Sequence, residues 1–433
     1  MHPSMKSVQL ALLAGPVLLL AAIFSGQATS AQIGAAHRTV LYAGIGHQII
    51  EYDVNLEKGA LNQLGSITVP ANVQEAWTSP SRKFLYVAWS TRDDTNPAAY
   101  EALRGTLNQD GASTFRIDPA TGALTLQGVP APLPSRPIYI TTDIDGTHVI
   151  TAQNNPSGLT VQQILPDGTV GAAVPQTGKL DFGIYAHQVR VDPSNHSVIL
   201  VTRGNYATAT KPEDPGAIRI FSYKNGVLSP RQTIALNGGF NYQVRHLDFH
   251  PSGKWVYVTV ERQNKLHVYR RAADGTLSDA PIFVKDTVAD PAKPHDGQSA
   301  SSIHMHPSGK FVYVANRAEG TVEFEGKRVS AGGENTIAVF SINQDTGEPT
   351  LIQRVDTRGF SPRTFAVDAS GSVLAVANQN SRSVRDGSSV RTVPARLTLF
   401  RIGGDGKLDF THQYNFETGG SVSLFWTGIV TLP

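Results

Sequence analysis

The chain has no cysteine among its 433 residues. A thiolate zinc site, a cysteine nucleophile and a disulfide framework are therefore excluded. Neither sign of charge predominates, because the net charge is only +2. The 37 lysines and arginines form no basic run, which argues against nucleic-acid binding. We expect a monomer that binds a small molecule and needs no cofactor.

Long apolar segments are missing except at the N-terminus. There, Lys6 precedes a mostly apolar stretch from Val8 to Phe24, and small residues follow it up to Ala31. This order is typical of a secretory signal peptide, which we predict over residues 1–31. An uncleaved anchor is the alternative, but the stretch has only 17 residues and is interrupted by glycine and proline. We expect an exported protein, periplasmic or secreted, with no membrane span after cleavage.

What the sequence does contain is one repeated unit. A short β-type run ends at a tight turn in QEAWTSP (74–80), IYITTDI (138–144), HQVRVDP (187–193), RHLDFHP (245–251), SSIHMHP (301–307) and RTFAVDA (363–369). A second and a third run with period-two alternation follow each time. A further turn closes each unit, marked by Gly59, Gly122, Gly168, Gly226, Gly275, Gly347 and Gly406. Seven such units predict an all-β fold, a seven-bladed β-propeller over residues 37–433.

The two ends of the chain complement each other. The first unit, HRTVLYAG, has a second strand but no first strand before it, while the last residues, TGIVTLP, align with RHLDFHP and then stop. We therefore predict that the C-terminal segment forms the innermost strand of blade one and closes the ring.

Two repeat positions are polar without an evident turn role. One starts the innermost strand and is occupied by Gln74, Ile138, His187, Arg245, Ser301, Arg363 and, from the closing segment, Thr427. The other ends the second strand and is occupied by Gly46, Ser90, Asn154, Arg203, Glu261, Arg317 and Gln379. Because the two strands are antiparallel, both positions lie at the same end of the blade. We expect two rings of side chains at one mouth of the central channel.

The charges in these rings suggest an anion pocket with a general base. Four arginines surround one glutamate and one histidine. Each charge alone is better explained as a solvated strand end, but their convergence on a concave mouth favours a site. His250 and His306 stand where other repeats have a turn aspartate, so we read them as turn residues. His304 and His306 lack a third ligand, and no metal site is predicted.

The chain from residue 37 to residue 433 resembles the seven-bladed propeller lactonases, which include bacterial 6-phosphogluconolactonase of the propeller type and fungal carboxymuconate cyclase. The similar stretches are HQVRVDP, RHLDFHP, YVTVERQNKLHVY and HMHPSGKFVYVANRAEG. The resemblance implies that His187, Arg245, Glu261 and Arg317 form the active site.

The expected function is hydrolysis of a small, anionic lactone. Either Glu261 or His187 takes a proton from water, while Arg245 and Arg317 hold the carbonyl oxygen as it becomes an oxyanion. The rest of the substrate is expected to contact Arg203, Arg363, Asn154 and Gln379. An isomerase of the carboxymuconate cyclase type and a non-catalytic propeller that binds an anionic ligand or a protein remain alternatives.

Long insertions follow the second strand in four units, and all leave from the end where the rings lie. We expect them to form walls or lids around the mouth. They cover residues 91–112, 204–216, 318–335 and 380–395.

The N-terminal segment makes a testable prediction. Mass spectrometry of the exported fraction should find a mature N-terminus near Ala31 or Gln32, because the small residues there suit a signal peptidase. Recovery of the intact chain from the cytoplasm, with Met1 retained, would contradict this prediction.

Overall fold

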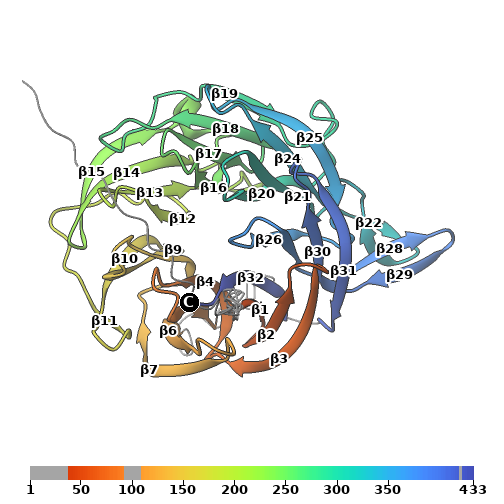
Figure 1. Ribbon diagram of the computed structural model, residues 1–433. Coiled ribbons are helices and arrows are strands. Elements are labelled where there is room, and N and C mark those ends of the chain that lie inside the picture. Colours follow the sequence, from red (N-terminus) through yellow and green to blue (C-terminus); the bar gives the residue numbers. More distant parts are fainter. Residues whose placement is uncertain (1–37, 92–108, 419–421) are drawn as a thin grey trace, which may run out of the picture. The chain divides into compact units, whose positions relative to one another are not determined.

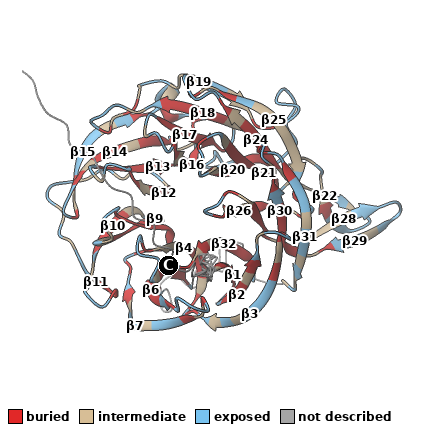
Figure 2. Cartoon of the chain, in the orientation of Figure 1, coloured by how far each residue is buried: buried red, intermediate tan, exposed pale blue. Residues whose placement is uncertain are grey.

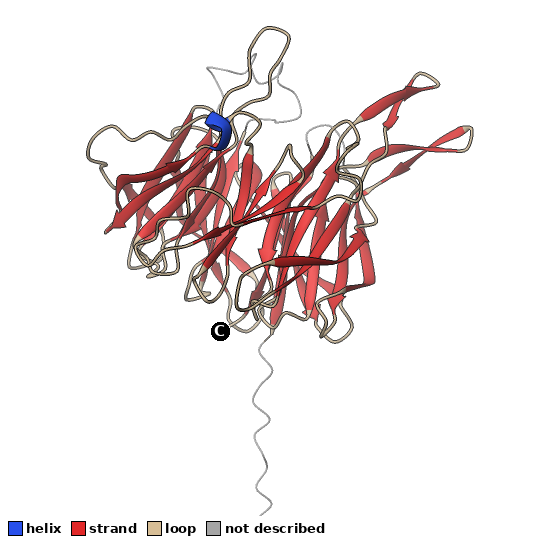
Figure 3. Cartoon of the chain, turned by 90° about the horizontal axis from the view of Figure 1, so that it is seen from above, coloured by secondary structure: helices blue, strands red, loops and turns tan. Residues whose placement is uncertain are grey.

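Strands make up nearly all of the regular structure in the computed structural model, which describes residues 38–91, 109–418 and 422–433. The described residues form seven four-stranded antiparallel sheets arranged in a ring (Figure 1). Their one helix is the short 3-10 turn η1 (Leu236–Gly239), blue in Figure 3. No helix in these ranges is long and apolar enough to cross a membrane. The predicted seven-bladed propeller is confirmed.

The first four blades, each given from the inside outward, consist of these strands: β32 (Leu424–Thr431), β1 (Thr39–Ile45), β2 (Gln48–Asn55) and β3 (Ala60–Thr68); β4 (Asn72–Thr78), β5 (Phe84–Ser90), β6 (Asp110–Ile117) and β7 (Leu124–Pro132); β8 (Pro137–Thr142), β9 (His148–Asn154), β10 (Ser157–Ile164) and β11 (Val170–Ala173); β12 (Ala186–Val191), β13 (Ser197–Thr202), β14 (Ala217–Lys224) and β15 (Val227–Ile234).

Blades five to seven consist of these strands: β16 (Val244–Phe249), β17 (Trp255–Val260), β18 (Lys265–Arg270) and β19 (Phe283–Asp286); β20 (Gln298–Met305), β21 (Phe311–Ala318), β24 (Thr336–Ile342) and β25 (Pro349–Asp356); β26 (Pro362–Val367), β27 (Val373–Asn378), β30 (Ala395–Ile402) and β31 (Leu408–Phe416).

The ring is closed by the C-terminal strand. β32 pairs antiparallel with β1, from Thr431 opposite Thr39 to Leu424 opposite Ile45. Blade one thus combines the C-terminal strand β32 with β1, β2 and β3, the first three strands of the described chain. This is the closure that the sequence predicts. Without β32, the inner edge of β1 would present unpaired backbone groups to the channel.

Burial is greatest in the inner strands of each blade and lowest in the outermost strand, as Figure 2 shows. Second strands such as β13, β17 and β27 are buried along their whole length, because each lies between the faces of neighbouring blades. Outer strands such as β3 and β31 alternate between exposed and partly buried positions. The sequence follows this gradient: SVILVT and WVYVTV are apolar runs, whereas the outermost strands alternate.

Side chains of the repeated turns tie each blade to the next. The Nε2 of His250 donates to the carbonyl of Gly309 at 2.9 Å, and its Nδ1 lies 2.8 Å from the Ser252 hydroxyl. His306 contacts Gly371 and Ser308 in the same way. The turn role predicted for both histidines is confirmed.

Four buried tyrosines of the second strands also connect neighbouring blades. Each donates a hydrogen bond to a glycine carbonyl in the adjacent blade: Tyr42 to Gly122, Tyr86 to Gly168, Tyr257 to Gly347 and Tyr313 to Gly406.

Three of the four expected insertions are described. Residues 318–335 carry the hairpin β22 (Thr321–Phe324) and β23 (Lys327–Ser330), and residues 380–395 carry β28 (Arg382–Asp386) and β29 (Ser389–Val393). The two hairpins lie side by side and project from the ring (Figure 1). The insertion 204–216 has no strand, and most of the insertion 91–112 lies outside the described residues.

Closure can be tested by truncation. Deleting residues 427–433 should lower the midpoint of thermal unfolding by about 10 °C or more, because the deletion breaks most of the β1–β32 pairing. As a control, deleting residues 384–391 removes hydrogen-bonded pairs of the β28–β29 hairpin outside the ring and should change the midpoint little. Equal midpoints for the truncated and intact proteins would rule out this closure.

Candidate active site

A β-bulge interrupts every innermost strand near its start. In blade five, Val244 pairs with Val260 and His246 with Thr259, so Arg245 is an extra residue. The other blades insert one residue at the equivalent place: Gln74, Ile138, His187, Arg363, Phe425 and, in blade six, one of Ser301 and Ser302. A bulge bends the strand and re-aims its side chain. The bulges therefore set the direction of the first predicted ring.

One member of that ring was predicted wrongly. In blade one the extra residue is Phe425, not Thr427, because Gly44 pairs with Trp426 and Ile45 with Leu424. The sequence alignment matched Pro433 with the turn prolines, whereas the pairing with β1 sets a register that differs by two residues. The ring of Phe425 lies 4.0 Å from the guanidinium carbon of Arg363.

Glu261 lies at the centre of an ion network built from three blades. Its Oε1 accepts a hydrogen bond from Nη2 of Arg317 at 2.5 Å and lies 3.7 Å from Nη1 of Arg203. Its Oε2 lies 3.7 Å from Nε of Arg245. The Glu261 side chain is only 2% exposed. The structure thus brings four of the predicted site residues into direct contact.

The arginines fix the ionisation state of Glu261. Burial alone would raise the pKa of this carboxyl, but Arg203, Arg317 and Arg245 outweigh it and lower the pKa to about 2. The carboxylate is therefore ionised at neutral pH and binds protons weakly. Such a group balances positive charge well but is a poor general base near neutral pH.

His187 has the opposite character. The side chain is buried, and its Nδ1 has no hydrogen-bond partner among the described residues. Burial and then the charge of Arg245 lower its pKa well below 6.5, so the imidazole is neutral at pH 7. Its ring stands edge-on to that of His246, with 5.1 Å between the centroids. A neutral imidazole has one nitrogen that can accept a proton, but burial and the charge of Arg245 make His187 a weaker base than a free histidine.

Arg245 is buried and incompletely paired, and the partly exposed Arg363 lies close enough to affect its pKa. Nε and Nη1 of Arg245 make no hydrogen bond within the described structure, although the residue is 1% exposed. Burial, followed by the charge of Arg317, lowers the pKa of Arg245 and lowers that of Arg363 to about 10. A buried guanidinium with unpaired N–H groups is suited to an anionic ligand.

The sequence pattern missed two tyrosines at this mouth. Tyr185 has a positive φ of 56° immediately before β12, and its ring lies 4.0 Å from the guanidinium carbon of Arg203. Although burial opposes it, Arg203 and then Arg136 lower the pKa of Tyr185. Tyr206, from the insertion 204–216, lies 5.6 Å from the same guanidinium. Neither residue occupies one of the two repeat positions that predicted the rings. The only signal in the sequence was that Tyr185 lies just before β12 and that Tyr206 lies in the insertion 204–216.

The two amide residues predicted to bind substrate are less closely connected. Asn154 ends β9, and its buried Oδ1 has no partner among the described residues. Gln379 follows β27 and is held through its backbone, which donates to Ser361 and accepts from Leu424. No hydrogen bond or ion pair of the described side chains joins either residue to the Glu261 network. Within the same ranges, no three His, Asp or Glu side chains are grouped so as to hold a metal ion.

Comparison with known proteins identifies the family. Residues 31–386 match the family model described as a seven-bladed β-propeller lactonase. The chain belongs to this family. It is 28% identical to the 6-phosphogluconolactonase of Pectobacterium carotovorum over 329 residues, 76% of this chain and 83% of the relative. The 6-phosphogluconolactonase of Bacillus subtilis is also 28% identical, over 338 residues, 76% of this chain and 84% of the relative.

Solved structures share the fold. The periplasmic gluconolactonase of Pseudomonas aeruginosa superposes with a TM-score of 0.64 at 17% identity, over 92% of this chain and 100% of that one. A Bacteroides uniformis protein proposed to be a 6-phosphogluconolactonase superposes with a TM-score of 0.66 at 21% identity, over 91% and 100%.

The Glu261 network predicts a pH-dependent stability. Glu261→Gln should reduce the free energy of unfolding at pH 7 by about 3–5 kcal/mol, because Arg203, Arg245 and Arg317 lose the buried negative charge of Glu261. The folded-state pKa is lowered from 4.5 to about 2, so this stabilisation is complete above pH 4.5 and is lost as the pH falls toward 2. Denaturant unfolding of both proteins across this range should show the difference narrowing.

Glu348→Gln is the control for this experiment. Glu348 pairs with Lys285 at 2.6 Å but is 44% exposed, so its loss should cost less than about 1 kcal/mol. A Glu261→Gln difference that is equally small, or that does not change with pH, would contradict the buried network.

Proposed function

We propose that the protein is a lactonase that hydrolyses a small anionic lactone of the sugar-lactone type. The observation that carries the proposal is that two groups lie at one mouth of the channel. One is the neutral, buried imidazole of His187, and the other is the guanidinium of Arg245, which has N–H groups without a hydrogen-bond partner among the described residues. The family and the names of the curated relatives support the same reaction class.

The proposed reaction adds water across the ring ester. His187 accepts a proton from water as the water oxygen attacks the carbonyl carbon, and the carbonyl oxygen becomes an oxyanion stabilised by Arg245. Collapse of this intermediate breaks the ring C–O bond. The leaving alkoxide then takes the proton back from imidazolium, which gives the hydroxy acid. No other reactant is required.

Glu261 has a different role in this scheme. Its pKa of about 2 disfavours proton transfer from water, and we assign the role of base to His187, whose imidazole is uncharged at neutral pH although burial and Arg245 lower its pKa as well. Glu261 instead positions Arg317 through the 2.5 Å hydrogen bond and offsets the charge of the surrounding arginines. Without it, mutual repulsion would spread these cations.

The remaining predicted residues are assigned to the anionic end of the substrate. Arg363 makes its close contact with an aromatic ring, and Nε of Arg203 has no partner among the described residues. Both can therefore pair with a phosphate or carboxylate group. Asn154 and Gln379 are proposed to line the outer mouth. The insertion 204–216, which carries Tyr206, would form part of its wall.

Export, proposed from residues 1–31, affects which lactone the enzyme meets. A phosphorylated sugar lactone is an intermediate of cytoplasmic metabolism, so an exported enzyme would more often encounter other acidic lactones. The arginine cluster accepts either, since carboxylate and phosphate both suit a guanidinium.

The test is steady-state kinetics on a panel of lactones with the mature chain, residues 32–433. His187→Ala should lower kcat by about 10² to 10⁴, because the proton acceptor is lost. Arg245→Ala should lower kcat by about 10² to 10³, because the oxyanion loses its donor. Arg363→Ala should mainly raise KM if it binds the anionic substituent. His196→Ala, an exposed residue on the opposite turn of blade four, serves as the control.

Two results would overturn the proposal. One is the absence of turnover of every lactone by the wild type, which would favour a binding protein. The other is an unchanged kcat in His187→Ala. Incorporation of ¹⁸O from labelled water into the product separates hydrolysis from a cyclase-type isomerisation, which adds no water.

A further inference from the structure

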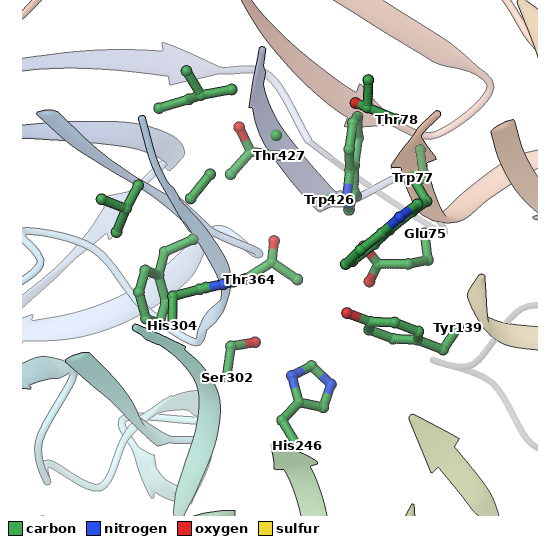
Figure 4. Close-up of a pocket in the computed structure, with 16 residues that line it drawn as sticks. Glu75, Trp77, Thr78, Tyr139, His246, Ser302, His304, Thr364, Trp426 and Thr427 are labelled. Carbon is green, nitrogen blue, oxygen red and sulfur yellow. The ribbon is translucent and has the colours of Figure 1, made fainter. Parts of the chain in front are cut away.

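A second cavity lies in the channel, on the turn side of the bulges. Its volume is about 280 Å³ (Figure 4). Six innermost strands line it with a residue at or directly after the bulge: Glu75, Tyr139, His246, Ser302, Thr364 and Trp426. The bulge therefore separates two layers of side chains. The first layer forms the mouth described above, and the second forms this channel pocket.

Aromatic rings form one side of the channel pocket. Figure 4 shows Trp77, Tyr139 and Trp426 grouped around Glu75. The Trp77 and Tyr139 rings are tilted at 52° to each other, with 6.2 Å between their centroids. Flat aromatic surfaces of this kind suit the C–H faces of a ring-shaped ligand.

The groups that line the pocket carry little net charge at neutral pH. Burial raises the pKa of Glu75 to about 8 even though Arg363 and Arg245 oppose it, so its carboxyl is mostly protonated. Burial also lowers the pKa values of His246 and His304, which are therefore neutral. Arg190, beside the Trp77 ring, is paired with Asp248 at 3.2 Å. Among the described lining residues an anion would find no cation, and a cation would find the Glu75 carboxyl mostly uncharged.

The hydroxyl groups of the pocket have acceptor capacity left. Ser302 donates to the Arg363 carbonyl at 2.6 Å, and Thr364 donates to the Phe425 carbonyl at 3.4 Å. Thr427 donates to the backbone of blade one at 3.1 Å. Each hydroxyl has used its only proton and keeps its lone pairs. A ligand must therefore bring several donors of its own.

From these features we propose that the channel pocket binds an uncharged polyhydroxylated molecule, such as a single sugar ring or a cyclic polyol. The volume of 280 Å³ is at the lower limit of the roughly 300–1,000 Å³ typical of small-molecule sites, which fits one ring rather than an oligosaccharide. The chemistry differs from that of the mouth, where unpaired arginines select an anion. The proposal does not depend on the lactonase reaction.

Isothermal titration calorimetry of the mature chain with glucose and with myo-inositol tests the proposal. At least one should bind the wild type, and Thr364→Val should weaken that binding by about 5- to 10-fold through loss of an acceptor. Ser302→Ala should do the same and replaces Thr364→Val if the latter does not fold. The matched control is Thr151→Val, a buried threonine of β9 whose hydroxyl donates to the Thr160 carbonyl at 3.5 Å away from the pocket. It should bind like the wild type.

Choline and Glu75→Gln distinguish a cation from a neutral ligand. Because an amide resembles the protonated carboxyl, Glu75→Gln should keep sugar or inositol binding within about 3-fold. Tighter binding of choline that is lost in Glu75→Gln would overturn the proposal in favour of an aromatic cage for cations. Failure of both polyols to bind, or equal binding by wild type and both hydroxyl variants, would also overturn it. Lactone turnover is measured separately, so such a failure would leave the proposed reaction untouched.

Discussion

The pairing of β32 with β1 is the constraint on which the rest of the structure depends. The second strand of a propeller blade has an inner edge of backbone N–H and C=O groups. Only the innermost strand of the same blade can pair with these groups. In blade one that strand comes from the other end of the chain. Pairing of β32 with β1 places Phe425 against Arg363. It also places Trp426 in the lining of the channel pocket. Closure therefore completes both layers of side chains as well as the ring.

The bulges arrange the side chains inside this ring. A regular innermost strand would send alternate side chains to opposite faces of the blade, where they would pack between blades. The extra residue breaks that alternation and lets Arg245 and its neighbour His246 serve two different layers of the channel. The same device, repeated around the axis, converts one repeat position into a ring of functional groups.

Burial then decides what these groups can do. Glu261 among three arginines remains ionised, whereas Glu75, a layer below, is mostly protonated at neutral pH because its burial outweighs the charges of Arg363 and Arg245. Two glutamates of one channel thus have opposite protonation because desolvation is outweighed in one place and dominates in the other. A mouth with ionised groups and an inner pocket with mostly uncharged groups can coexist on this basis.

Much of this follows from the sequence alone. The repeat period, the turn glycines and the complementary ends determine a seven-bladed ring closed by the C-terminus, because each is a local pattern with one structural solution. The same periodicity brings Arg203, Arg245, Glu261 and Arg317 to one mouth. The register of the last strand was missed by two residues, because it is set by pairing with β1, which is distant in sequence. Tyr185 and Tyr206 reach the site from positions outside the repeat pattern. The protonation states of His187, Glu75 and Glu261 were decided only by the tertiary structure, because they depend on which charges lie within a few ångströms and on how much water is excluded, and neither quantity is local in sequence.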